Sequence, residues 1–301
     1  MYHFGDANVT EHSSYDSDCM VGVDVFDAYK DSPAARKEAH VERLPARSAA
    51  FLSDIHANDA ALTAVFAEIA ADPPDVVVLN GDITWGTFPT ETVDLIEELR
   101  DLVDRVVLIR GNGDRALLDL HSGDRAPSSP RDPWMVARHT SRDVDVLSGV
   151  VFQVEVDIPE VGVVRACHGS PRADIELITP GTPLDRLATA TADVDADVLL
   201  TGHVHVQFHR PVDGLRIRHS MNPGSVGIPY AVDRPGAYWL RIDGTRPDPF
   251  DFRRTDYDLE TYLGRMLATD DPRADVIAEY LRKPPTRDEM VAHAEQLVFS
   301  D

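Results

Sequence analysis

Short apolar runs alternate with amphipathic stretches along the first half of the chain. The apolar runs occupy residues 47–52, 75–79 and 105–109, and the run at 75–79, which is continuously apolar after Asp75, is typical of a strand buried on both faces. Between these runs, residues 59–71 and 90–102 have the pattern of amphipathic helices. Strands and helices that alternate at this spacing are typical of βαβ units, so the pattern predicts an α/β fold with a largely parallel sheet.

In the second half of the chain the pattern favours strands. The predicted elements are a helix at 134–147, a strand at 150–156 that alternates like an exposed strand, strands at 161–167 and 197–200 around a helix at 183–192, and mainly strands from 206 to 254. Two or three short helices are predicted within residues 258–296.

These patterns divide the chain into three parts. Residues 1–45 show no sustained period and predict an N-terminal extension that is mobile or laid on the surface. Residues 46–255 predict one α/β domain, and residues 256–301 predict a short helical segment appended to it.

Composition and charge narrow the classes of function. Hydrophobic residues make up 43% of the 301 residues, which is enough for a sizeable core. The formal net charge of −23 disfavours binding to duplex nucleic acid, although bound cations would allow a small anionic substrate. The two cysteines are far apart, so a disulfide framework is not expected and a cysteine-rich zinc module is excluded. With no signal-like segment and no apolar run of the roughly 18 to 20 residues that span a membrane, we expect a cytoplasmic protein without a membrane partner.

Polar residues follow the C-terminal ends of the apolar runs, where open α/β sheets place their ligand sites. In chain order these motifs are Asp54-Ile55-His56, Gly81-Asp82, Gly111-Asn112-Gly113-Asp114, His168-Gly169 and Gly202-His203-Val204-His205. Each motif alone is weak and recurs by chance. Their occurrence together, each after a separate predicted strand, is what points to a common site.

The side chains in these motifs suit divalent metal ions. The candidate ligands are Asp54, His56, Asp82, Asn112, His168, His203 and His205. Mixed imidazole, carboxylate and amide donors without thiolate suit Mn, Fe, Zn or Ni. Seven such ligands could hold two ions roughly 3.5 to 4 Å apart, which can activate water and clamp both oxygens of an in-line phosphoryl displacement.

The complete set resembles the calcineurin-like metallophosphoesterase family, whose pattern is Asp-x-His, Gly-Asp, Gly-Asn-His-Asp/Glu, a single His and Gly-His-x-His. The segment Asn222–Gly227 also resembles the Asn-x-Gly-Ser turn of the small bacterial branch of phosphodiesterases and phosphatases, and the resemblance covers roughly residues 48–255. It implies a four-layer α/β/β/α sandwich and two divalent ions, with Mn favoured. One ion would be held by Asp54, His56, Asp82 and His205, and the other by Asp82, Asn112, His168 and His203.

One position departs from the family pattern. Gly113 stands where many members carry the histidine that protonates the leaving group. Loss of a general acid costs about 10² to 10⁴ in rate when the leaving group is poor, so the sequence favours a phosphodiester or an activated ester as the small phosphorylated substrate. Without that histidine, Asp114 could itself face the site. The candidate catalytic residues are Asp82, Asn112 and Asp114.

Substrate contacts leave alternatives open. Trp85 forms an aromatic wall or packs its loop, Arg172 binds a phosphate oxygen or forms a surface ion pair, and Tyr230 is a third candidate contact. Two other functions remain compatible with the sequence: a catalytically weak metal-binding, phosphate-binding or scaffold protein, and a small-molecule phosphomonoesterase. A function in partner contacts of the terminal segments is a further alternative. The sequence does not predict the oligomeric state.

Overall fold

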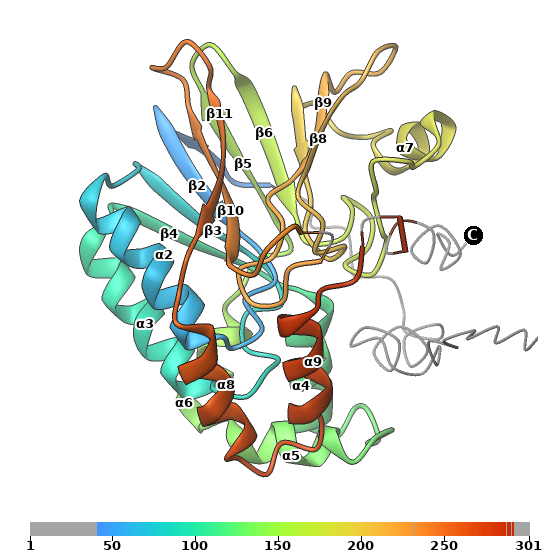
Figure 1. The fold of residues 1–301 in the computed structure, drawn as a ribbon. Helices are drawn as coiled ribbons and strands as arrows, with labels where there is room; N and C mark the ends of the chain where they lie inside the picture. The colour runs from blue at the N-terminus through green and yellow to red at the C-terminus, as the bar shows by residue number, and fades with distance from the viewer. Residues whose placement is uncertain (1–40, 231, 287, 290, 292–301) are drawn as a thin grey trace, which may run out of the picture.

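The computed structural model describes residues 41–230, 232–286, 288, 289 and 291 and consists of two β-sheets with helices packed against them (Figure 1). The expected mixed α/β class is confirmed. The first sheet has the strand order β11-β10-β2-β3-β4. Its strands are β2 (Ser48–Leu52), β3 (Val76–Asn80), β4 (Arg105–Ile109), β10 (Ala237–Asp243) and β11 (Phe250–Thr255). β2, β3 and β4 are parallel, as the βαβ pattern predicts, whereas β10 joins β2 and β11 in antiparallel pairs.

The second sheet has the strand order β1-β5-β6-β7-β9-β8. Its strands are β1 (Arg43–Pro45), β5 (Gln153–Ile158), β6 (Gly162–Cys167), β7 (Val198–Leu200), β8 (Phe208–Pro211) and β9 (His219–Asn222). β6, β7 and β9 are parallel to one another, and β5 and β8 add antiparallel strands on either side.

Alternation of side chains along β2 explains why its residues 49–52 are all apolar. Phe51 points toward the second sheet and packs in a cluster with Val78, Val156 and Val164. Leu52, its neighbour, points to the opposite face of the first sheet. Because both faces are covered, apolar residues are needed on both sides of the strand.

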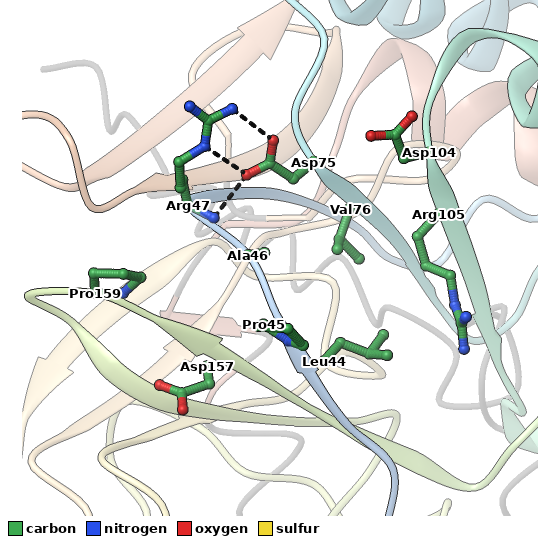
Figure 2. A pocket seen from close by; sticks show the side chains of 10 residues that line it. All are labelled: Leu44, Pro45, Ala46, Arg47, Asp75, Val76, Asp104, Arg105, Asp157 and Pro159. Carbon is green, nitrogen blue, oxygen red and sulfur yellow. Dashed lines mark hydrogen bonds and ion pairs between the residues drawn. The ribbon is translucent and has the colours of Figure 1, made fainter.

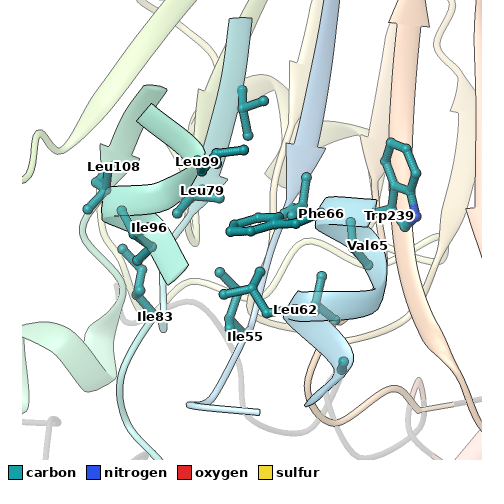
Figure 3. Close-up of a cluster of buried hydrophobic side chains, with 14 of the residues drawn as sticks. Ile55, Leu62, Val65, Phe66, Leu79, Ile83, Ile96, Leu99, Leu108 and Trp239 are labelled. Carbon is teal, nitrogen blue, oxygen red and sulfur yellow. The ribbon is translucent and has the colours of Figure 1, made fainter. Parts of the chain in front are cut away.

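Two helices cover the outer face of the first sheet. These are α2 (Asp59–Ala71) and α3 (Pro89–Leu102), which Figure 1 shows side by side. Figure 3 shows how Phe66 of α2 and Leu99 of α3 pack against Leu79 of β3. On the outer face of the second sheet, Leu187 of α7 (Leu184–Ala190) packs against Leu199.

The single helix predicted at 134–147 is wrong, because the chain forms α5 (Arg131–Arg138) and α6 (Ser141–Ser148) there. The helix α6 restarts at Thr140, whose hydroxyl accepts a hydrogen bond from the backbone N–H of Asp143 while the Asp143 carboxylate accepts one from the backbone N–H of Thr140. This reciprocal cap ends one helix and begins the next.

The strand predicted at 150–156 begins three residues later and ends two residues later, as β5, and is buried rather than exposed. Val154 and Val156 face the first sheet, while Glu155 on the other face is buried through ion pairs with Arg43 and Arg165. The charged residue that suggested an exposed face of the strand is therefore part of a buried ion-paired group.

The last three residues of the expected extension, Arg43–Pro45, form β1 and pair in parallel with β5. Leu44 is buried in the cluster between the sheets, whereas Arg43 and Pro45 are exposed. The rest of the expected extension, residues 1–40, lies outside the described residues.

The C-terminal segment forms short helices, as expected, and these pack against the main domain. Its helices α8 (Leu259–Leu267) and α9 (Ala274–Arg282) bury Leu263 and Ile277 in a cluster with Phe88 and Ile228 of the main domain. Within the described part of the chain, no helix is both long and apolar enough to cross a membrane.

Candidate metal centre

The candidate ligands lie at the edge where the carboxyl ends of strands from both sheets meet. Asp54 and His56 follow β2, and Asp82 follows β3. His168 follows β6, and His203 with His205 follows β7, so the second sheet supplies the other histidines. Asn112 follows β4 as the first residue of α4 (Asn112–Ser122).

Backbone strain is concentrated at these positions. Left-handed backbone conformations occur at Asp54, His56, Asp82, His203 and His205, with φ angles of 54°, 48°, 51°, 66° and 56°. Such conformations are uncommon in residues other than glycine and cost free energy unless the surroundings enforce them. Five of them at one edge indicate that the fold holds these side chains in place for a function.

The first compact group consists of Asp54, His56 and His205, whose ligand atoms all lie within 4.8 Å of one another. Nε2 of His205 lies 3.3 Å from Oδ1 of Asp54 and 3.0 Å from Nε2 of His56. All three side chains are buried.

The second group consists of Asp82, His168 and His203, again with ligand atoms within 4.8 Å of one another. Oδ1 of Asn112 lies 3.0 Å from Nε2 of His168, so the amide joins this group. Asp82 reaches both groups, with Oδ1 3.5 Å from Nε2 of His168 and Oδ2 3.7 Å from Nε2 of His56. All seven candidate ligands therefore converge on one place, with Asp82 between two sets.

Three of the imidazoles are oriented by backbone carbonyl groups. Nδ1 of His56 donates to the carbonyl of Trp85 at 3.0 Å, and Nδ1 of His205 donates to that of Ile228 at 2.7 Å. Nδ1 of His168 donates to the carbonyl of Asn80 at 2.9 Å. Because a carbonyl oxygen can only accept, each neutral ring carries its proton on Nδ1 and presents the lone pair of Nε2.

The orientation of the imidazoles bears on whether these residues can bind a metal ion. The Nε2 atoms of His56 and His205 face each other at 3.0 Å, yet two lone pairs cannot form a hydrogen bond. A cation held by these two nitrogens and the Asp54 carboxylate would resolve this arrangement. The donor set therefore fits a divalent ion that accepts nitrogen and oxygen ligands.

The pKa values of the four histidines shift in two directions: they are lowered at two residues and raised at the other two. Burial lowers the pKa of His56 to about 3, with His205 adding to the effect, and burial also lowers the pKa of His203. Burial opposes protonation of His168 and His205 too, but Asp82 raises the pKa of His168 and Asp54 raises that of His205. The carboxylates thus favour positive charge at the centre of the site.

Backbone groups hold the carboxylate of Asp114, one of the candidate catalytic residues. Its carboxylate accepts hydrogen bonds from the backbone N–H groups of Gly111 at 2.9 Å, Ile83 at 2.9 Å and Thr84 at 3.4 Å. Burial raises the pKa of Asp114 to about 6, and the nearby charge of Asp82 acts in the same direction. The contacts make Asp114 a residue that caps α4 and holds the loop after β3.

The three candidate substrate contacts have other partners in this structure. Arg172 forms an ion pair with Glu176, which is the alternative the sequence left open for it. Trp85 is buried in the cluster under α2 and α3, in agreement with the loop-packing alternative. Tyr230 stacks on the ring of His205 with centroids 4.7 Å apart and planes 15° apart, and burial raises the pKa of its hydroxyl. Tyr230 therefore supports a candidate ligand.

The sequence did not indicate the residues whose side chains hydrogen-bond to the backbone of the ligand-bearing loops. The hydroxyl of Ser225 donates to the carbonyl of Asp54 at 2.7 Å, and the amide of Asn222 donates to the carbonyl of Gly202 at 2.7 Å. Their signal was the turn at 222–227, noted only as a resemblance. The carbonyl groups of Trp85, Asn80 and Ile228 leave no signal, since every residue has one.

A groove of about 640 Å³ lies away from this centre (Figure 2). It is bordered by Arg47, Asp75 and Asp104, which precede β2, β3 and β4, at the opposite ends of these strands from the candidate ligands. Arg47 and Asp75 are paired with each other across its rim. None of the candidate site residues lines this groove.

Comparisons with known proteins agree with this architecture. The fold is similar to that of a metallophosphoesterase from Sphaerobacter thermophilus, with 24% identity over 78% of this chain and 99% of that chain and a TM-score of 0.59. It is also similar to a hypothetical protein from Pyrococcus horikoshii, with 19% identity over 81% of this chain and 100% of that chain and a TM-score of 0.65. No curated protein matches the sequence.

The family model described as a calcineurin-like phosphoesterase superfamily domain matches residues 48–245, about two thirds of the chain. This segment contains both groups of candidate ligands. The resemblance noted in the sequence is thereby confirmed, and the chain belongs to the calcineurin-like phosphoesterase superfamily.

Proposed function

We propose that this protein is a phosphoesterase that holds two divalent ions, with manganese favoured, and hydrolyses a small phosphodiester or an activated phosphate ester. The observation that carries the proposal is the pair of three-residue groups, together with the position of Asp82, which belongs to the second group and also lies near His56 of the first. A carboxylate has two oxygens and can bind two cations at once, which a histidine in the same place could not.

The residues of the chain have distinct tasks in this proposal. Asp54, His56 and His205 would hold one ion, Asn112, His168 and His203 would hold the other, and Asp82 would contribute to both. When bound, the two ions supply Lewis acidity toward phosphoryl oxygens and lower the pKa of water. The backbone carbonyls at Nδ1 fix the imidazoles, so the ligand atoms are in place before a substrate arrives.

The preference for diesters or activated esters rests on the surroundings of Gly113. This position offers no side-chain proton, and the carboxylate of Asp114 next to it is occupied by three backbone N–H groups. A leaving group with a low pKa needs no protonation by the protein, whereas an unactivated alkoxide does. The same feature is the reason to keep a second candidate, a protein that binds metal and phosphate with little turnover.

Metal-dependent hydrolysis is the first test of the proposed function. Metal-stripped protein is expected to release p-nitrophenolate from bis(p-nitrophenyl) phosphate only after Mn²⁺ is added, and faster than from p-nitrophenyl phosphate. Both substrates have an activated leaving group, so the missing acid cannot mask a working site. Folded protein that binds Mn²⁺ but releases nothing would support the binding protein, and a higher rate with the monoester would support a phosphomonoesterase.

Restoring a histidine at position 113 is expected to lower activity, not to raise it. A Cβ atom on Gly113 would lie 2.9 Å from Cβ of Trp85 and 3.1 Å from Oδ1 of Asp82. The displacement of Asp82 is expected to reduce kcat/KM of Gly113→His about 10- to 100-fold in the same assay, because small shifts of reacting groups cost that much.

Gly149→His is the matched control, since Gly149 is exposed and a Cβ atom there would meet nothing closer than 3.6 Å. This variant is expected to keep the activity of the unmodified protein. An increase in rate for Gly113→His would contradict the steric argument and show that Trp85 can yield.

A further inference from the structure

The C-terminal helices cover loops that carry candidate ligands. Tyr262 and Leu263 of α8 and Ile277 of α9 are buried with Phe88, which lies in the loop after Asp82. The same cluster contains Val204, between His203 and His205, together with Ile228 and Tyr230. Both helices lie beyond the segment 48–245 that matches the family model. An element outside the matched segment thus packs on the loops that carry the candidate ligands.

A buried carboxylate joins this helix pair to the loop after Asp82. The side chain of Asp271, in the turn between α8 and α9, is fully buried. It accepts two hydrogen bonds from the guanidinium of Arg131 at 3.0 and 2.8 Å and one from the hydroxyl of Thr87 at 2.9 Å. Burial of a charge is costly unless it is paired and hydrogen-bonded, and Asp271 meets both conditions.

Thr87 lies in the part of the loop that touches His56. The carbonyl of Trp85 accepts the hydrogen bond from Nδ1 of His56 at 3.0 Å. At Gly86 the loop passes so close that a Cβ atom would lie 1.8 Å from the carbonyl oxygen of His56. The hydroxyl of Thr87 is therefore an anchor two residues from the carbonyl that orients His56.

We propose that Asp271, acting through Thr87, is a positioning residue for His56. The Asp271–Thr87 hydrogen bond holds the loop, the loop holds the Trp85 carbonyl against Nδ1, and this contact keeps the Nε2 lone pair of His56 directed at the first ligand group. The inference rests on the proposed function, because it assigns a task to the helix pair at the same metal centre.

The test removes the hydroxyl and leaves the ion pair. In Thr87→Val the shape of the side chain is nearly kept and Asp271 still pairs with Arg131. Metal-free full-length protein is titrated with Co²⁺, whose absorption spectrum reports binding. One of the two ions is expected to bind about tenfold more weakly, while the other binds as before. Tenfold is the lower end of the loss in metal affinity that follows when a partner of a metal ligand is removed.

A second measurement needs no metal. Long-range ¹⁵N–¹H correlation spectra of the His56 ring report which nitrogen carries the proton. The Nδ1–H form is expected to dominate in the unmodified protein and to lose population in Thr87→Val. Thr87→Ala serves the same purpose if the valine variant does not fold.

Two variants separate positioning from a general loss of stability. Thr87→Ser keeps the hydroxyl and is expected to restore both the Co²⁺ affinity and the tautomer. Thr191→Val removes a buried hydroxyl that donates to the carbonyl of Leu187 in α7, remote from the site, and is expected to change neither.

Three outcomes would overturn the inference. They are unchanged Co²⁺ affinities in Thr87→Val, an unchanged His56 tautomer, and an equal loss of affinity in Thr191→Val. Unmodified protein that takes up no Co²⁺ would contradict the proposed function, and the tautomer measured without metal would then still decide whether Thr87 positions His56.

Discussion

Asp82→Asn is expected to reduce hydrolysis of bis(p-nitrophenyl) phosphate in saturating Mn²⁺ by about 10³-fold or more. The asparagine amide keeps the size of the side chain and can still accept the hydrogen bond that Oδ1 receives from the backbone N–H of Gly113 at 2.7 Å. It removes the negative charge that lies between the two ligand groups. The Lewis acidity of bound ions is worth several kcal/mol, and a loss of about 4 kcal/mol corresponds to the predicted factor.

The control for this variant is Asp101→Asn, which makes the same chemical change at an exposed position near the end of α3. It is expected to retain the activity of the unmodified protein. If Asp82→Asn kept activity within tenfold while binding the same amount of Mn²⁺, a bridging role for this carboxylate would be wrong.

The second large effect is expected at Gly86, where the loop after β3 crosses His56. A Cβ atom would lie 1.8 Å from the carbonyl oxygen and 2.5 Å from the carbonyl carbon of His56. The backbone at position 86 and the backbone of His56 would therefore have to move apart. Overpacking of this kind costs about 1 to 3 kcal/mol or more, and Gly86→Ala is expected to lower Tm by about 5 to 10 °C. Because the displaced atoms belong to His56, Mn²⁺ affinity is expected to fall as well.

Gly264→Ala gives a matched comparison for Gly86→Ala. Gly264 lies inside α8, and a Cβ atom there would meet nothing within 4 Å. The same added methyl group should therefore stabilise the protein by about 0.5 to 1 kcal/mol through helix propensity. Gly86→Ala with an unchanged Tm and full metal affinity would refute the close contact described here. Differential scanning calorimetry with and without Mn²⁺ makes the comparison.

The ligand-bearing edge could be predicted because its signals are local. Asp54 and His56 stand two residues apart directly after a buried strand, and the same is true of His203 and His205. Parallel strands end at the same edge of a sheet, so the order of the motifs along the chain was enough to bring them together. The structure adds the distances and the tautomers.

Other features could not be predicted because they depend on contacts between distant segments. Thr87 and Asp271 are 184 positions apart, and neither belongs to a recognisable motif. The pairing of Arg43–Pro45 with β5 is similar, because a three-residue strand has no period to detect. Arg172 shows the limit of prediction from local sequence most plainly. Its partner Glu176 lies only four residues away. The sequence does not show whether the guanidinium pairs with Glu176 or with a substrate, because that depends on the surrounding packing.

Neither sheet holds a complete ligand group by itself. The first sheet supplies Asp54 and His56 to one group and Asp82 to the other, while the second sheet supplies His168, His203 and His205. These contributions are separated by more than 80 residues. Metal uptake should therefore report the docking of the two sheets, because neither ligand group is complete without it. Ions that bind only the docked form would also slow its opening, so refolding followed by Co²⁺ absorption would time this step directly.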